Sequence, residues 1–239
     1  MTQIRTFFSA VPGVGKTTTV LHLAVALVRM GQRVLCVDAD PARGLFRIAG
    51  LTSPANQDPL RVDSTTLPGL SFRAQGPALS HVPISASDSS GPAEDWILID
   101  TVGRLPPRWT LPPGARVVVC TDASEEAPEQ VERLLVDLLH MRNGHPLFTL
   151  DRLLFSRLDW ISRAQFENSH TWRKALGPMG LWRTQIRQDR TYTMRSLLQK
   201  ARIAAPDSPL GDDSTRLALE WLQSPQSGNA RFSHVDTLL

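Results

Sequence analysis

Residues 4–20 read IRTFFSAVPGVGKTTTV, and this stretch decides the fold. The apolar run of residues 4–8 predicts a short buried β-strand. Gly13 and Gly15 then interrupt the pattern, and apolar residues return at helical spacing from Val20 onward. The stretch therefore predicts a strand, a glycine-containing loop and a helix in immediate succession.

The loop between this strand and this helix has the composition of a phosphate-binding loop, or P-loop. Its glycines let the backbone curl so that amide N–H groups point inward, and the helix N-terminus adds the positive end of its dipole. Lys16 would place a positive charge between the terminal phosphates, and Thr17 would hold Mg²⁺. We expect nucleotide contacts from these residues: Pro12, Gly13, Val14, Gly15, Lys16, Thr17, Thr18 and Gly103.

Acidic residues follow two later strand-like runs. Asp100 ends the apolar run of residues 96–99, and Asp38 and Asp40 follow the run of residues 34–37. The carboxyl ends of parallel strands meet at one edge of a sheet, where ligands of open α/β folds collect. We therefore expect Thr17, Asp38 and Asp100 to form the Mg²⁺ site, and Asp40 to act with Lys16 in catalysis by orienting or deprotonating the attacking water. Strand-end or turn-forming roles are the structural alternatives for these three acids.

Further apolar runs at residues 115–120 and 150–155, with a helical pattern at residues 129–140, continue an alternation of strands and helices. This alternation predicts a single-domain α/β P-loop NTPase with a twisted, mostly parallel sheet and helices on both faces.

We expect one domain over residues 1–223 and a flexible tail over residues 224–239. Residues 51–92 are rich in small and polar residues and predict a loop-rich excursion with a short strand near residues 70–73. The last helix is expected at residues 213–223, starting at Asp213 and burying Leu217, Leu219 and Trp221 or their neighbours.

Composition narrows the class of protein. The chain has 239 residues, 26 Lys and Arg against 23 Asp and Glu, 41% hydrophobic residues and two Cys. These values exclude collagen-like, disordered and disulfide-scaffold proteins. No apolar run reaches the length of about 18 residues that an integral membrane segment needs. The first residues also lack the pattern of a signal peptide, so we expect a cytoplasmic protein. In that compartment we expect Cys36 and Cys120 to be reduced and buried.

These motifs, in this order, resemble the ParA/MinD family of deviant Walker ATPases, over roughly residues 1–50 and 94–222. The resemblance implies a mostly parallel sheet, ATP and Mg²⁺ as cofactors, and an ATP-dependent homodimer that hydrolysis releases. It assigns phosphate and Mg²⁺ contacts to Lys16 and Thr17, water activation to Asp40 and a metal-shell role to Asp100. The family's signature lysine, which reaches the partner's nucleotide, falls at Val11 here.

The C-terminal third favours the BcsQ branch of the family, and the partition branch is the alternative. Residues 186–189, which read IRQD, and the run LALEW at residues 217–221 resemble the end of BcsQ proteins. That resemblance implies an accessory ATPase whose protein partner is the bacterial cellulose synthase apparatus. The other branch comprises partition ATPases, whose partners are non-specific DNA and a centromere-binding protein.

Charge supports a DNA-binding surface. Residues 151–202 hold nine Arg and two Lys against four acidic residues. Such a face could neutralise DNA phosphates, and its expected cluster is Arg183, Arg187, Arg190 and Arg195. A solvated arginine-rich surface is the alternative.

The sequence leaves two other functions open. Asp100-Thr-Val-Gly-Arg104 and Ser156-Arg-Leu-Asp159 resemble motifs of signal-recognition GTPases, in which Asp159 would pair with guanine and a lysine would stand at Arg157. A non-enzymatic scaffold that binds nucleotide is the third candidate, since Ala10 replaces the first P-loop glycine.

Overall fold

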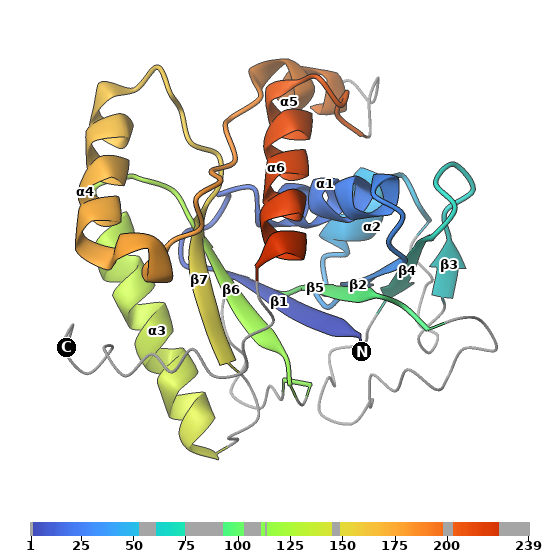
Figure 1. Ribbon diagram of the computed structural model, residues 1–239, viewed down its shortest axis with the longest axis horizontal. Helices are drawn as coiled ribbons and strands as arrows, with labels where there is room; N and C mark the ends of the chain where they lie inside the picture. Colours follow the sequence, from blue (N-terminus) through green and yellow to red (C-terminus); the bar gives the residue numbers. More distant parts are fainter. Residues whose placement is uncertain are drawn as a thin grey trace.

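The computed structural model describes residues 2–52, 61–74, 93–102, 111–112, 114–144, 149–197 and 203–224. In chain order its elements are β1 (Gln3–Ser9), α1 (Lys16–Arg29), β2 (Val34–Asp38), α2 (Gly44–Ala49), β3 (Arg61–Asp63), β4 (Leu70–Ala74), β5 (Trp96–Asp100), β6 (Arg116–Thr121), α3 (Ala127–Gly144), β7 (Thr149–Phe155), α4 (Arg163–Gly180), α5 (Arg190–Leu197) and α6 (Pro209–Gln223) (Figure 1).

The strands form one seven-stranded sheet in the order β3-β4-β2-β5-β1-β6-β7. All neighbouring pairs are parallel except β3 and β4. β1 lies inside the sheet between β5 and β6, and the register pairs Phe7 with Asp100 and Asp38 with Asp100. The carboxyl ends of β1, β2 and β5 therefore meet at one edge.

The side chains of alternate strand residues belong to two apolar cores, one on each face of the sheet. On one face, Phe7, Cys36 and Leu98 pack with residues of α1, α2 and α6. On the other face, neighbouring strand residues pack against α3 and against Trp172 and Leu176 of α4. Helices on both faces confirm the predicted α/β class.

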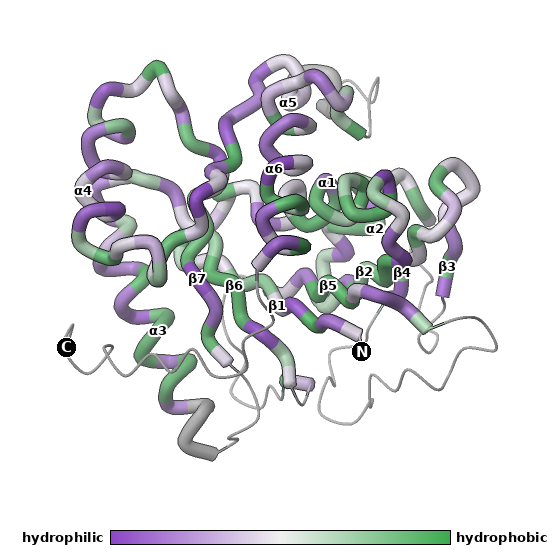
Figure 2. The backbone as a smooth tube through the Cα atoms, viewed as in Figure 1, coloured by the Kyte–Doolittle hydropathy of each residue, from purple (hydrophilic) through white to green (hydrophobic). Residues whose placement is uncertain are grey.

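Helix α1 lies between other layers rather than at the surface. Ten of its residues are buried, and it packs against both the sheet and α6. Figure 2 accordingly shows α1 as mainly hydrophobic, whereas α4 and α6 alternate between hydrophobic and hydrophilic residues. A helix with one solvent face has this alternation.

The segment after α4 runs along the outer edge of β7. Trp182 N donates to Leu153 O at 3.0 Å, and Ile186 N donates to Phe155 O at 2.9 Å. Leu158 N then donates to Ile186 O at 2.9 Å, which ties the loop after β7 to the same segment. These bonds bring residues 186–190 to the carboxyl edge of the sheet, beside the loop that follows β7.

The predicted strands are confirmed, including the short strand near residues 70–73, and Gly31 ends α1 with a φ of 81°. The predicted start of the last helix is wrong. α6 begins at Pro209 after Ser208, which accepts a hydrogen bond from Gly211 N at 3.2 Å. Leu217 and Trp221 are buried, but Leu219 is 44% exposed because it lies on the outer face of the helix.

Other predictions are only partly testable. Cys36 and Cys120 are free and buried, and burial raises the pKa of both thiols. Most of the expected excursion at residues 51–92 and nearly all of the expected tail lie outside the described residues. Within the described part of the chain, no helix is both long and apolar enough to cross a membrane.

Candidate functional site

The loop of residues 10–15 joins β1 to α1 at the carboxyl edge of the sheet. Gly13 and Gly15 have φ values of 76° and 83°, in the left-handed region where an L side chain is strained. α1 begins immediately afterwards at Lys16, and Gly15 has no side chain that could cap its first turn. The loop and this helix start thus have the backbone shape that presents N–H groups to an anion.

The Lys16 side chain is buried at this helix start. Its Nζ donates to Oδ1 of Asp100 and to the carbonyl oxygen of Thr101. Because β5 is hydrogen-bonded to β1, the end of β5 lies beside the loop. The structure therefore brings together Lys16 and Asp100, which are 84 residues apart in the chain.

Asp100 is fully buried, and burial raises the pKa of its carboxyl group, against the lowering effects of Lys16 and Thr17. Among the described residues, its second oxygen, Oδ2, has no hydrogen-bond partner. An unsatisfied buried carboxylate oxygen near a threonine hydroxyl suits a hard cation such as Mg²⁺. The described part of the chain contains no group of three His, Cys, Asp or Glu residues that could hold a metal. Mg²⁺ here would therefore need phosphate or water oxygens as well.

Asp38 is buried at the end of β2, next to Asp100 in the sheet register. Its Oδ1 accepts from Asp40 N at 3.1 Å, and its Oδ2 accepts from Leu45 N at 3.0 Å and Phe46 N at 3.1 Å. Burial raises the pKa of Asp38 to about 6, and the charge of Asp100 adds to the rise. Asp38 thus holds the start of α2 in place, and its role toward Mg²⁺ stays a prediction.

Asp40 is partly exposed on the turn between β2 and α2. Its Oδ1 accepts from Ala42 N at 2.8 Å, which fixes the turn. Its charge also raises the pKa of Asp100, so the two carboxylates share one edge of the sheet. The Asp40 carboxylate is thus anchored on the turn and partly open to solvent.

The residues that depart from the usual P-loop pattern serve in packing. Ala10 packs against the core on the α3 side, and Val11 packs against the core on the α1 side. Pro12 is exposed, and Val14 is buried. Thr17 and Thr18 are half-buried at the start of α1, whereas Gly103 lies outside the described residues.

With this geometry in view, the chain can be compared with known proteins. Residues 7–208 match the family model of the CobQ/CobB/MinD/ParA nucleotide-binding domain. The chain belongs to this family.

Relatives of known structure or name are similar over nearly the whole chain. The chromosome-partitioning ATPase Soj of Thermus thermophilus is 28% identical over 236 residues, covering 90% of this chain and 93% of Soj. The MinD cell division protein of Aquifex aeolicus has a TM-score of 0.69 at 16% identity, covering 96% of this chain and 99% of MinD. Cobyrinic acid a,c-diamide synthase of Mycobacterium smegmatis, bound to an ATP analogue and magnesium, has a TM-score of 0.72 at 18% identity, covering 96% of this chain and 97% of the synthase chain.

Sequence reasoning gave Arg157 no role at the P-loop of this ParA/MinD-family chain. Arg157 is the second residue after β7 and has a φ of 58°, which is uncommon outside glycine. Its guanidinium Nη1 donates to Gly13 O at 2.8 Å, so the side chain crosses the loop. A Cβ added at Gly13 would lie 3.6 Å from this guanidinium, at ordinary van der Waals contact. The strained backbone was not visible in the sequence pattern.

Asp159 is already engaged within the protein, which argues against the guanine-binding alternative. Its Oδ1 accepts from Ile161 N at 3.1 Å, and its Oδ2 accepts from Arg190 at 2.8 Å. These two hydrogen bonds lower the pKa of Asp159. Each oxygen of this carboxylate thus accepts one hydrogen bond within the protein, and the carboxylate fixes the loop after β7.

Two of the four arginines predicted as a DNA surface form ion pairs within the protein. Arg187 forms ion pairs with Asp212 and Asp213 at 3.0 and 2.8 Å, and Arg190 pairs with Asp159. Arg183 is exposed, and the side chain of Arg195 lies outside the described residues. Carboxylates that are distant in sequence therefore pair with Arg187 and Arg190, and a role of the four arginines in DNA binding stays a prediction.

A cavity of ≈ 620 Å³ opens next to these residues. Its walls come from the loop after β7, the start of α5 and the segment before α6, and include Leu158, Trp160, Arg190, Tyr192, Ala204 and Pro209. The sequence pattern does not predict this cavity, because its walls are far apart in the chain and meet only when the chain is folded.

Proposed function

We propose that the chain binds ATP with Mg²⁺ on the loop of residues 10–15, hydrolyses it, and uses the bound and released forms to control where another assembly sits. The proposal is carried by the buried contact of Lys16 with Asp100 at the start of α1. A buried cation and a buried acid at a glycine-loop helix start are what phosphoryl transfer with Mg²⁺ requires. The chain's membership of the family supports nucleotide binding.

The residues would divide the chemistry as follows. The loop amides and Lys16 would bind the phosphates, and Thr17 with Asp100 would hold Mg²⁺, which would neutralise phosphate charge when bound. Asp38 would keep its hydrogen bonds to the start of α2 and support the acidic edge from behind. Asp40, whose carboxylate is partly exposed, would orient the attacking water.

The base and ribose would extend from the loop toward the cavity. Arg157 contacts Gly13 and is followed in the chain by Leu158, which lines the cavity. His22 of α1 also reaches the cavity wall, since it accepts a hydrogen bond from Ala204 N at 2.9 Å. Arg157 thus connects the cavity wall to the P-loop, and His22 connects it to the helix that follows the loop.

We propose a nucleotide-dependent homodimer as the active form. The family fold and the position of the loop at an open sheet edge support this proposal. Val11 packs against the core, so another residue than the signature lysine would have to complete the contact between the two copies.

Two biological processes are candidates for this chain. Similarity to Soj over 90% of the chain favours partition of DNA with a centromere-binding partner. An accessory role at the cellulose synthase apparatus rests on the C-terminal resemblance and on Val11 in place of the signature lysine, which BcsQ proteins can also lack. In both, the protein would work in the cytoplasm.

Two substitutions test the enzyme proposal. Lys16→Ala should abolish ATP binding, because it removes the phosphate-binding cation. Asp40→Ala should leave binding within about threefold and lower the rate of phosphate release by at least about a hundredfold, since positioning of the nucleophile is lost. Calorimetry and a phosphate-release assay measure the two effects.

The control is Asp122→Ala, a change at the end of β6 where the carboxylate only bonds Ser124. Retention of ATP binding by Lys16→Ala would contradict the site. Binding without phosphate release from the wild type, with any partner, would establish the scaffold alternative instead.

A further inference from the structure

We infer that Arg157 is a positioning residue of the phosphate site, which holds the loop of residues 10–15 in its anion-binding shape before a ligand arrives. It would do so by fixing the direction of one peptide unit, the unit that joins Gly13 to Val14. This role rests on the proposed function, because it concerns the same loop.

The Arg157 side chain lies along the loop. Its Nη1 donates to Gly13 O at 2.8 Å, and a Cβ placed at Gly15 would lie 3.9 Å from the Cβ of Arg157. Among the described residues, the hydrogen-bond partner of this guanidinium is a loop carbonyl, whereas Arg187 and Arg190 pair with carboxylates. The side chain therefore reaches from one glycine of the loop to the other.

The hydrogen bond to Gly13 O also sets the direction of an amide. The peptide bonds of the described chain are trans, and in a planar trans unit the C=O and the following N–H point in opposite directions. Because Gly13 O is held by the exposed Arg157, the N–H of Val14 is turned to the opposite side of the loop. An anion-binding loop needs successive N–H groups on one side, and this bond supplies the direction of one of them.

This peptide unit needs an external hold, because glycine leaves it free to rotate. Gly13 has no Cβ, and its φ of 76° lies in a region that glycine enters and leaves at little cost. Amides that converge on one point also repel one another through their partial positive charges until an anion is bound. A charged donor on Gly13 O opposes both effects, since it forms a hydrogen bond about twice as strong as a neutral donor does.

The backbone of Arg157 is itself fixed on both sides. Its φ of 58° is unfavourable for a residue with a Cβ, and such strain persists only where the surrounding structure enforces it. Ser156 N donates to Thr121 O of β6 at 2.8 Å, and Leu158 N donates to Ile186 O at 2.9 Å. A strained residue between two fixed neighbours is a rigid base for the side chain that holds the loop.

Two other roles for this side chain predict different results. A contact with the nucleotide base would matter for ATP but not for inorganic tripolyphosphate, which has no base. A direct contact with the phosphates would matter for both ligands but would not change the loop before they bind. The proposed role affects both ligands and also the unliganded loop.

The first measurement is the affinity of the full chain for ATP and for tripolyphosphate, each with Mg²⁺, by calorimetry. Arg157→Ala should weaken both by about tenfold, because one charged hydrogen bond is lost at an exposed position. Arg157→Lys keeps a charged donor and should stay within about threefold of wild type. At saturating ATP, phosphate release in both variants should change by less than about threefold, since the loop binds ground state and transition state alike.

Arg157→Gly separates the side chain from the strained backbone. Glycine adopts the φ of 58° without strain, so this variant should unfold at a urea concentration no lower than Arg157→Ala does. It lacks the guanidinium, so it should bind both ligands as weakly as Arg157→Ala. A stable protein with weak phosphate binding would show that the side chain acts on the loop and not on folding.

The second measurement concerns the loop without ligand. NMR order parameters of the Gly13, Val14 and Gly15 amides should be near about 0.85 in wild type, as for rigid backbone, and lower in Arg157→Ala and Arg157→Gly. Tripolyphosphate at saturation should restore them, because its oxygens then hold the same amides.

Arg163→Ala is the matched control. Arg163 is also an exposed arginine after β7, but its Nε donates to Glu167 of α4 at 2.7 Å rather than to the loop. Its loss should leave both affinities and the order parameters of the loop unchanged.

The outcomes distinguish this role from the proposed function. Wild-type affinities in Arg157→Ala, a loss for ATP alone, or a loss for both ligands with an unchanged free loop would each overturn the role of Arg157 and leave the P-loop proposal intact. Full affinity in Arg157→Gly would do the same, because the backbone would then be the cause. Absence of Lys16-dependent binding of ATP and tripolyphosphate in the wild type would overturn both.

Discussion

His22 lies on α1, the helix that begins with Lys16, and it is almost completely buried. Its Nε2 accepts a hydrogen bond from Ala204 N, so Nδ1 must carry the proton that Thr18 O accepts at 2.8 Å. Its ring also meets Tyr192 edge-on, with 4.7 Å between ring centroids. The neutral His22 side chain thus links the P-loop helix to two walls of the cavity.

Burial lowers the pKa of His22 to about 4. Below the ordinary histidine pKa of about 6.5, the unfolded chain takes up a proton that the folded chain refuses. The stabilisation by neutral His22 is therefore complete above about pH 6.5 and is lost as the pH falls toward about 4.

We expect wild type to lose about 2 kcal/mol more of its free energy of unfolding than His22→Gln between pH 7.5 and pH 5. Glutamine keeps an acceptor and a donor but does not titrate. Urea unfolding at the two pH values measures the difference, and parallel losses in both proteins would contradict this role of His22.

At the scale of elements, α6 is held against the sheet by ion pairs as well as by apolar packing. Arg187 donates two bonds to Asp213 through Nε and Nη2, and Glu220 accepts the backbone N–H groups of Arg183 and Thr184 at 3.0 Å each. Trp221 of α6 stacks on Phe7 and Trp96 of the sheet. Polar contacts thus set the position of α6 along the segment before α5, while the tryptophan anchors its far end.

Arg187→Ala should lower the free energy of unfolding by about 2 kcal/mol. The side chain of Asp213 is only 6% exposed and would be left as an unpaired charge, but Arg187 is 33% exposed, so water softens the loss. Chemical denaturation measures this change.

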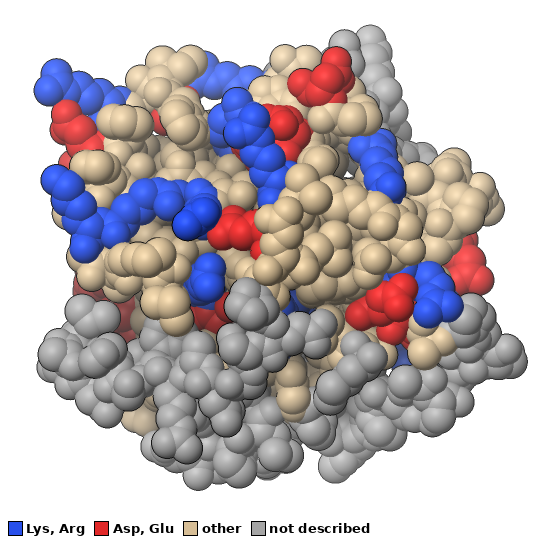
Figure 3. Space-filling model, in the orientation of Figure 1, with Lys and Arg blue, Asp and Glu red and all other residues tan. Residues whose placement is uncertain are grey.

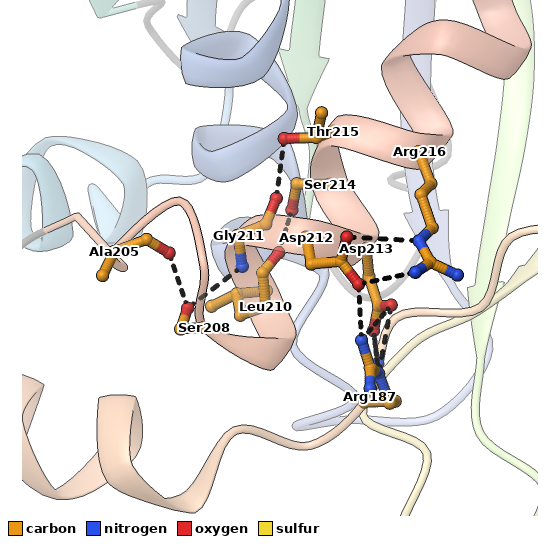
Figure 4. Close-up of polar contacts among 10 residues, drawn as sticks. All are labelled: Arg187, Ala205, Ser208, Leu210, Gly211, Asp212, Asp213, Ser214, Thr215 and Arg216. Atoms are coloured by element: carbon orange, nitrogen blue, oxygen red, sulfur yellow. Dashed lines mark hydrogen bonds and ion pairs between the residues drawn. The ribbon is translucent and has the colours of Figure 1, made fainter.

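Arg216→Ala is the control, because Arg216 pairs with Asp212 on the same helix but is 67% exposed (Figure 4). It should cost less than about 0.5 kcal/mol. Equal effects of the two substitutions would show that Arg187 is an ordinary surface residue.

At the scale of the whole molecule, exposed positive charge gathers on α4 and on the segment that follows it. Figure 3 shows Lys and Arg side chains together on the α4 side of this face. Lys174 on α4 and Arg183 after it are both exposed, and Arg173 donates to Arg183 O at 2.8 Å. A DNA-binding partition ATPase would use these cations.

We expect ATP-dependent DNA binding that weakens with salt if the chain is a partition ATPase. The double variant Lys174→Ala/Arg183→Ala should lower the slope of log K against log salt by about 2, since about 0.9 ion is released per phosphate contact. Gel shifts at several salt concentrations, with and without ATP, measure this slope.

Arg33→Ala is the control, because Arg33 pairs with Asp95 before β5 at the other end of the sheet. It should leave the slope unchanged. DNA binding that ignores ATP, or no DNA binding at all, would remove the partition role and favour the cellulose-synthesis alternative.

Local pattern was sufficient for much of the fold. The apolar runs ending at Asp38 and Asp100 were recognisable as buried strands because both faces of a parallel sheet are covered, so the runs are continuous. The start of α6 was misjudged, because Asp213 and Ser214 have capping chemistry but the helix takes Ser208 as its cap.

The sequence by itself determined the strand, glycine loop and helix around Lys16 and the order of the acids that follow it, because these depend on backbone geometry and on the period of apolar residues. Only the tertiary structure decided that the Arg157 side chain crosses the loop and that Asp159 and Arg187 form ion pairs. It also decided that a cavity opens beside Trp160. Such contacts join residues far apart in the chain, and their partners are set by how the helices pack on the sheet rather than by any local pattern.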